Sequence, residues 1–173
     1  MIVIEEPPAP PVTLAEMKAF LRIGHDGEDD LLGALIRSAS EMCESFTGRA
    51  LLPRDLKETL PASSAWTRLG AGPVRSIAGV ETTSGPLPID AYATDIDAAG
   101  DGWVRVLSAG GARVVRIAYA AGLAAEADGL PEALRHGVMR LAAHFYTHRE
   151  REDGAGPPAA VTALWRPWRK VRI

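Results

Sequence analysis

The sequence has little of what many small functional sites depend on. Cys43 is the only cysteine among 173 residues, so neither an intrachain disulfide nor a CxxC metal pair can form. No apolar run approaches the ~20 residues that a bilayer crossing requires. The start, MIVIEEPPAP, lacks the basic region and apolar stretch of a secretory signal. We therefore expect a soluble chain in the cytoplasm, with no membrane partner and with its one thiol packed as a small hydrophobic group.

Motifs for nucleotide binding and catalysis are also missing. The 17 glycines form neither GxGxxG nor GxxxxGK[ST], and no GxSxG elbow presents a serine. His144 and His148 are four residues apart, a spacing that can turn two imidazoles toward one metal. However, Phe145 stands where a zinc-protease helix carries glutamate, and no third ligand is indicated. We expect no catalytic residue, metal or cofactor, and keep a small metal-dependent enzyme using His144 and His148 as the lesser alternative.

Charge is unevenly distributed along the chain. The net charge is -3, and residues 1–45 hold nine acidic and three basic side chains, whereas residues 160–173 hold four basic side chains and no acid. Tight binding to a phosphate backbone needs clustered Lys and Arg, so an acidic chain is not expected to hold duplex DNA. The 47% apolar content is enough for the core of one domain.

Helix signals stand at both ends of the sequence. Four prolines favour an extended arm over residues 1–12, and TLAE from Thr13 has the form of a capping box, which predicts a helix over 14–23 that ends near Gly24. An apolar stripe with spacings of three and four predicts a helix over 29–47, and a second such stripe after Pro131 predicts one over 131–149.

The middle of the chain, residues 54–120, is predicted to be rich in β-strand, because Gly, Pro and Ser punctuate short runs with a period of two. WVRVL and RVVRIAY are joined by SAGGA, which is short enough for an antiparallel hairpin. We expect a small sheet on one side of the helices. The predicted fold is α+β but mainly α: a helical bundle with a small antiparallel β insertion and an extended C-terminal tail.

Residues 151–173 are predicted to be a linker followed by that tail. In the tail, apolar and basic residues alternate, namely Leu164, Trp165, Arg166, Trp168, Arg169, Lys170 and Arg172. The segment is too short to bury its own tryptophans, and Trp and Arg dominate binding hot spots, which favours docking into another protein. A tail folded back on its own domain and a nucleic-acid-binding tail remain as alternatives.

The order of these parts resembles the phage head-tail connector (adaptor) family of tailed phages and gene transfer agents. The resemblance rests on TLAEMKAFLRI, on the acidic GEDDLLGALIRSASEMCESFTGRAL, on AYAAG and on LPEALRHGVMRLAAHFYTHRE. The positions that match the family pattern are Lys18, Leu21, Arg22, Asp29, Asp30, Glu44, Thr47, Gly48, Arg49, Tyr146, Arg149 and Glu150. Each motif is common alone, but their order is rarely met, and together they span most of residues 13–150, the expected connector domain.

The resemblance implies a structural subunit without catalysis. It implies a homo-oligomeric ring, a dodecamer, in the neck of a virion that assembles in the bacterial cytoplasm. The ring would lie between the portal protein and the next neck protein, a stopper or tail terminator, and DNA would pass through its lumen without specific binding. The tail from Leu164 to Arg172 would dock into the portal, and subunit contacts are expected at Asp29, Asp30, Arg37 and Arg149. A generic soluble interaction module unrelated to phage is the remaining alternative.

Overall fold

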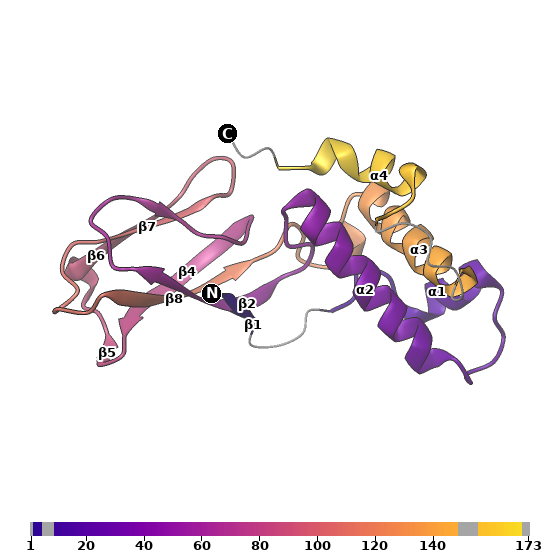
Figure 1. Ribbon diagram of the computed structural model, residues 1–173, viewed down its shortest axis with the longest axis horizontal. Coiled ribbons are helices and arrows are strands. Elements are labelled where there is room, and N and C mark those ends of the chain that lie inside the picture. The colour runs from indigo at the N-terminus through magenta and orange to yellow at the C-terminus, as the bar shows by residue number, and fades with distance from the viewer. Residues whose placement is uncertain (1, 5–8, 149–155, 171–173) are drawn as a thin grey trace. The chain divides into compact units, whose positions relative to one another are not determined.

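The computed structural model of the chain describes residues 2–4, 9–148 and 156–170 (Figure 1). It consists of two compact units, each assembled from two stretches of sequence. The β unit contains Met1–Pro8 and Leu52–Leu123, and the helical unit contains Ala9–Leu51 and Ala124–Ile173. The larger stretch of the β unit, Leu52–Leu123, is therefore an insertion between the two halves of the helical unit.

Four α-helices make up the described part of the helical unit. They are α1 (Leu14–Leu21), α2 (Asp29–Thr47), α3 (Glu132–Thr147) and α4 (Ala159–Trp165), with two 3-10 turns, η2 (Ala127–Gly129) and η3 (Arg166–Trp168). The first three lie within the ranges at which the sequence predicts helices. The expected extended tail is wrong for the described residues, because α4 and η3 occupy that segment.

The predicted capping box at the start of α1 is confirmed. The Glu16 amide donates to Thr13 Oγ1 at 3.2 Å, and the Thr13 amide donates to Glu16 Oε2 at 2.7 Å. The helix ends earlier than Gly24, because Arg22 itself adopts the left-handed conformation at φ 59°. The Ile23 amide then donates to the Lys18 carbonyl at 2.9 Å, as in a Schellman motif.

The core of the helical unit lies between α2 and α3. Their apolar stripes are buried, from α2 Leu32, Ile36, Ala39 and Cys43, and from α3 Leu134, Val138, Leu141 and Ala142. Cys43 is fully buried, and burial raises the pKa of its thiol well above the usual range. The expectation that this thiol packs as a hydrophobic group is confirmed.

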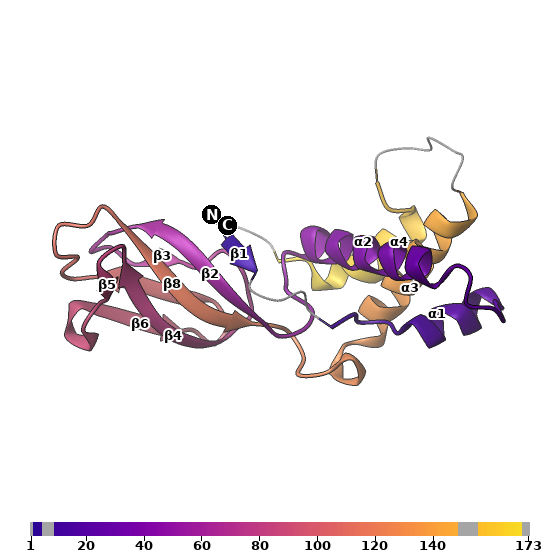
Figure 2. The same ribbon diagram turned by 90° about the horizontal axis from the view of Figure 1, so that it is seen from below.

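The described part of the β unit contains eight antiparallel strands in two sheets (Figure 2). The strands are β1 (Ile2–Ile4), β2 (Arg54–Pro61), β3 (Thr67–Arg68), β4 (Val74–Thr82), β5 (Gly85–Pro86), β6 (Tyr92–Ile96), β7 (Gly102–Val106) and β8 (Val114–Ala121). The larger sheet has the order β1-β2-β8-β4-β5, and the smaller has the order β3-β7-β6. Backbone bonds join the sheets, since the Val74 amide donates to the Gly100 carbonyl at 2.8 Å.

The predicted helical bundle with a small β insertion is wrong, although the class is α+β. β3 and β5 have only two residues each, and β4 carries two register irregularities against β8, so the alternation of apolar residues that reveals a strand is interrupted. The hairpin predicted across SAGGA is also wrong. β7 pairs with β3 and β6, whereas β8 pairs with β2 and β4, so that connection crosses from one sheet to the other.

A buried carboxylate fixes the chain between the two sheets. Glu58 of β2 is 6% exposed, and its Oε2 accepts hydrogen bonds from the Tyr119 hydroxyl and the Gly70 amide, each at 2.9 Å. Burial, reinforced by the neighbouring Glu58, raises the pKa of Tyr119 well above its usual range. Gly70 lies in the segment that leads from β3 of the smaller sheet to β4 of the larger sheet, so this contact binds that connection to β2 of the larger sheet.

Candidate functional site

The C-terminal segment, residues 156–170, carries most of the residues that the sequence assigns to partner binding. Pro158 precedes α4, and Pro167 lies within η3, where its fixed φ suits a tight turn. Val161 and Trp165 are buried, four residues apart on one face of α4. One face of the segment therefore belongs to the core of the helical unit.

Trp165 is the largest fully buried side chain of the described residues. The centroids of the Trp165 and Phe46 rings are 5.9 Å apart, and Trp165 Nε1 donates a hydrogen bond to the Leu134 carbonyl at 3.4 Å. The indole occupies space left by Gly137 of α3, where an added Cβ would come within 2.0 Å of Trp165 Nε1. A residue larger than glycine at position 137 would exclude this packing.

The expectation that the tail cannot bury its own tryptophans is therefore wrong for Trp165. The apolar stripe of α3 predicts which side of the helix is buried, but it does not show that Gly137 leaves a gap on that helix. That gap lets a short segment bury a large ring within its own unit. The available signal in the sequence is Gly137 itself, since a glycine inside a strongly helical pattern usually has a packing reason.

The rest of the segment is hydrogen-bonded to the residues at the end of α2. Arg49 Nε donates to the Trp168 carbonyl at 3.0 Å, and the Lys170 amide donates to the Thr47 carbonyl at 2.7 Å. Leu164, Trp168 and Lys170 are partly buried, whereas Arg166 and Arg169 are exposed. The Arg169 guanidinium lies 5.6 Å from the Phe46 ring centroid. Arg172 lies outside the described residues.

The residues expected at subunit contacts have different surroundings. Asp29 accepts a hydrogen bond from Lys18 Nζ at 2.8 Å, and Asp26 accepts one from the same ammonium at 2.5 Å. These bonds raise the pKa of Lys18, and the bond from Lys18 lowers the pKa of Asp26. Asp30 and Arg37 are exposed on α2, and Arg149 lies outside the described residues. Asp29 thus helps to fix α1 against the start of α2.

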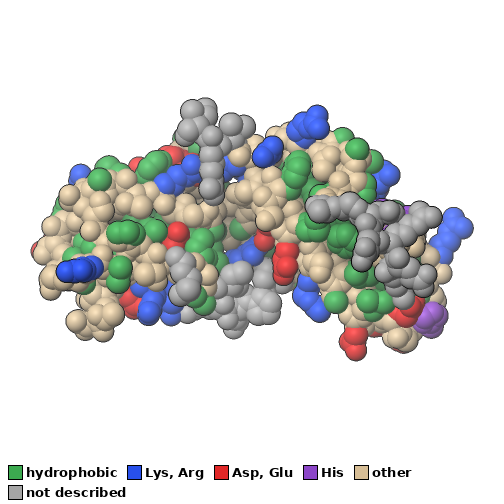
Figure 3. All heavy atoms as spheres, in the orientation of Figure 1, with side chains coloured by type: hydrophobic (Ala, Val, Ile, Leu, Met, Phe, Trp, Pro, Cys, Tyr) green, Lys and Arg blue, Asp and Glu red, His purple; other side chains and the backbone are tan. Residues whose placement is uncertain are grey.

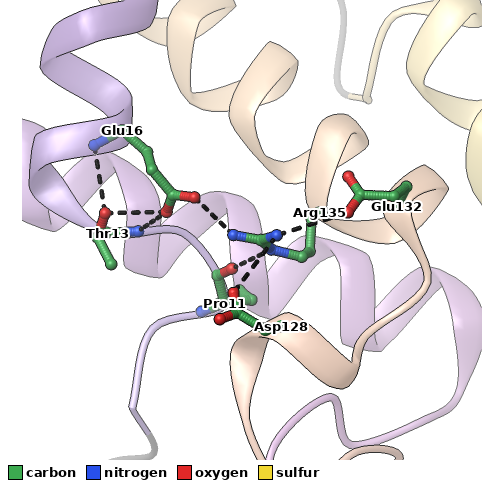
Figure 4. A network of polar contacts seen from close by, with 6 residues as sticks. All are labelled: Pro11, Thr13, Glu16, Asp128, Glu132 and Arg135. Carbon is green, nitrogen blue, oxygen red and sulfur yellow. Dashed lines mark hydrogen bonds and ion pairs between the residues drawn. The ribbon is translucent and has the colours of Figure 1, made fainter.

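A polar network around Arg135 was not expected from the sequence (Figure 4). From α3, Arg135 donates to Glu16 Oε1 at 2.6 Å and to the Pro11 carbonyl at 3.2 Å. Asp128 and Glu132 lie within 3.8 Å of the same guanidinium. The hydrogen bond from the Thr13 backbone amide and, to a lesser degree, the Arg135 guanidinium lower the pKa of Glu16. The capping residue of α1 is thereby bound to α3, a link that no local pattern reveals.

The histidine pair does not form a metal site with other described residues. The His144 and His148 rings stack with centroids 4.3 Å apart, and His148 Nδ1 lies 3.0 Å from the carbonyl of His144. No group of three His, Cys, Asp or Glu residues that could hold a metal ion occurs in residues 2–4, 9–148 and 156–170. Within the same ranges, no helix combines the length and apolar character needed to cross a bilayer.

Comparison with known proteins gives one family and several solved structures. Residues 11–67 match the family model described as phage gp6-like head-tail connector protein. This range includes α1, α2 and the first strand of the insertion. Comparison with curated proteins gave no match. This match confirms the resemblance to the head-tail connector family over residues 11–67, which contain the first two of the motifs on which it rests.

The structural matches extend over the whole chain. A chain from the neck of an empty GTA particle computed with C6 symmetry matches with a TM-score of 0.80 at 24% identity. Chains from the virion of a native gene transfer agent (GTA) particle and from the neck of a native GTA particle computed with C12 symmetry match with TM-scores of 0.78 and 0.73, both at 26% identity. Each comparison covers 100% of this chain and 97% of the other, so both units have counterparts in those chains.

Proposed function

We propose that this relative of the phage head-tail connectors is a structural subunit in the neck of a phage or gene transfer agent particle. The observation that carries the proposal is the full-length agreement with chains from GTA particles, in which the β insertion is included as well as the helices. The family match over residues 11–67 supports the same assignment independently. The proposal places the protein in a virion and gives it a structural role rather than a catalytic one.

The subunits of the proposed neck form a ring. The neck structures that match were computed with C6 and C12 symmetry, which supports a ring of twelve copies for this chain. Asp30 and Arg37 are exposed on α2 with opposite charges, so they are suited to contacts between neighbours, and Arg149 is assigned the same role from the sequence. DNA passes through the ring without specific binding, and a second neck protein follows on the tail side.

The C-terminal segment is proposed to dock to the portal protein. Trp165 positions the segment from inside the helical unit, which leaves Arg166, Arg169 and the exposed part of Trp168 for the partner. Leu164, Lys170 and Arg172 complete the segment that the sequence assigns to this contact. Arginine forms bidentate bonds with carboxylates, so the portal surface is expected to be acidic.

Charge reversal of the exposed arginines tests this docking. The double variant Arg166→Glu and Arg169→Glu keeps Trp165 and should therefore keep the fold, while its affinity for purified portal rings should fall at least tenfold in co-sedimentation. Arg140→Glu, which reverses an exposed arginine on α3, is the matched control and should bind as the unchanged protein does. Equal binding by the double variant would remove the C-terminal segment from the proposed interface.

Ring formation is tested by the size of the assembly. Analytical ultracentrifugation with and without portal rings should give a complex with twelve copies of this chain per portal ring. A saturated complex with a few copies, or none, would contradict a closed ring.

A further inference from the structure

Four large hydrophobic side chains are exposed together at one end of the β unit. They are Trp66, Ile89, Leu107 and Val114, with exposures of 44%, 85%, 56% and 46%. Strand register places them at the same end, since Val114 is opposite Pro61, Tyr92 is opposite Val106, and Thr67 is opposite Val104. The chain enters and leaves the unit at the other end, where Arg54 is opposite Ala121. We call these four residues with Arg105 and Arg113 the tip surface.

The backbone that carries the tip surface is fixed by hydrogen bonds. The Leu107 and Ser108 amides both donate to the Ala91 carbonyl, at 2.8 and 3.0 Å. The Val106 amide donates to the Ser63 carbonyl at 2.7 Å, and the Ala62 amide donates to the Arg113 carbonyl at 2.9 Å. Three connections of the unit are therefore held together, so the exposed side chains stand on an ordered support. A preorganised apolar surface loses little conformational freedom when it binds.

The tip surface carries two arginines, Arg105 and Arg113, and the exposed carboxylate of Asp90 lies next to Ile89 in the chain. The Arg105 guanidinium lies 4.8 Å from the Trp66 ring centroid, and its Nε is buried without an acceptor among the described residues. Arg113 is exposed, whereas Arg116 is already paired with Glu81 at 3.1 Å. Figure 3 shows Lys or Arg side chains next to hydrophobic ones on the β unit, drawn at the left. Arg105 thus lies beside an exposed indole, and Arg next to Trp is the combination found at binding hot spots.

We propose that the tip surface is a docking site for another protein, one that presents a carboxylate beside apolar side chains. The carboxylate pairs with Arg105, and the apolar side chains cover Ile89 and Leu107. Three of the four exposed side chains are aliphatic, and two arginines belong to the surface. This composition suits a protein surface better than a phosphate backbone, which requires many cations. The tip surface is separate from the C-terminal segment. Its test in purified particles rests on the proposed function, namely that this chain is a subunit of the particle.

Site-specific photo-crosslinking tests the proposal. Benzoylphenylalanine replaces Leu107 in cells that produce the particle, and the products are identified by mass spectrometry both in the cells and in purified particles. We expect one discrete adduct with a single other protein. The control places the same label at Ala99, an exposed position in the β6–β7 turn at the opposite end of the smaller sheet, where no such adduct should form.

A second substitution tests the charge pairing. Arg105→Gln should reduce the Leu107 adduct at least fivefold, and Arg113→Gln should reduce it less, whereas Arg75→Gln at the far end of β4 should leave it unchanged. Circular dichroism melts check that each variant folds.

Adducts with DNA, with lipid or only with a second copy of this chain would overturn the proposal, as would equal labelling from Leu107 and Ala99. Absence of the chain from purified particles would instead contradict the proposed function, because the adduct in cells is measured separately.

Discussion

The helical unit and the β unit are each stabilised internally, by different kinds of contact. In the helical unit, side chains distant in sequence meet: Trp165 fills the space at Gly137, and Arg135 binds Pro11 and Glu16. In the β unit, β8 pairs along its length with β2 on one side and β4 on the other, so backbone bonds dominate. Single side-chain substitutions should therefore damage the helical unit more than the β unit.

Replacing the buried indole should have the largest effect. Trp165→Ala leaves a cavity between α3 and α4, and truncation of a buried Trp costs about 3–5 kcal/mol. Urea denaturation gives the loss, and hydrogen exchange should show it in α3 peptides before β8 peptides. Trp168→Ala, at a partly buried position, is the control with a smaller loss. Gly137→Ala should destabilise the unchanged protein but have little further effect in the Trp165→Ala variant, because the colliding atoms are gone.

Removing the central cation of the Arg135 network should come next. Arg135→Met keeps much of the side-chain volume but leaves the Pro11 carbonyl and the Glu16 carboxylate without their donor, at a cost of about 2–3 kcal/mol. The loss should be visible as faster exchange in α1. Arg140→Met on the exposed face of α3 should change the free energy of unfolding by less than about 0.5 kcal/mol. Equal losses in the two variants would mean that the network adds nothing.

The buried pair of the β unit should matter less. Tyr119→Phe removes the hydroxyl that donates to Glu58, but the Gly70 amide still donates to the same oxygen. We expect a loss of about 1–2 kcal/mol, confined to the β unit, in urea denaturation followed by hydrogen exchange. A loss as large as that of Arg135→Met would break the distinction drawn between the units.

The smallest expected effect is the pH dependence contributed by Glu16. Its pKa is lowered in the folded chain, so its contribution is fully present above the unfolded pKa, near the ordinary value of 4.5, and is lost as pH falls through the folded pKa. The carboxylate is partly exposed, which limits the contribution to about 1 kcal/mol or less. The difference in stability between the unchanged protein and Glu16→Gln, measured in urea from pH 6 to pH 3, should shrink as pH falls. A constant difference would contradict the linkage.

The same contrast explains which parts of the fold could be predicted. The capping box and the glycine end of α2 are local signals, since the residues that interact lie within a few positions of one another. Strand alternation tells which side of a strand is buried but not which strand lies beside it, so the sequence predicts a hairpin between β7 and β8 that the structure does not have. The sequence predicts a partner contact for Trp165, because the space that receives the indole is made by Gly137, on another helix. The bonds of Arg135 cannot be predicted from a local pattern, because its acceptors are more than one hundred residues away.

The buried thiol of Cys43 has a practical consequence. Because no other cysteine occurs in the sequence and this one is fully buried with a raised pKa, maleimide reagents should not modify the native chain. A cysteine introduced at any exposed position would then be the sole reactive group, without prior removal of Cys43. Spin labels or fluorophores could be attached one per copy, and distances between copies in an assembled particle could be measured on an otherwise unaltered protein.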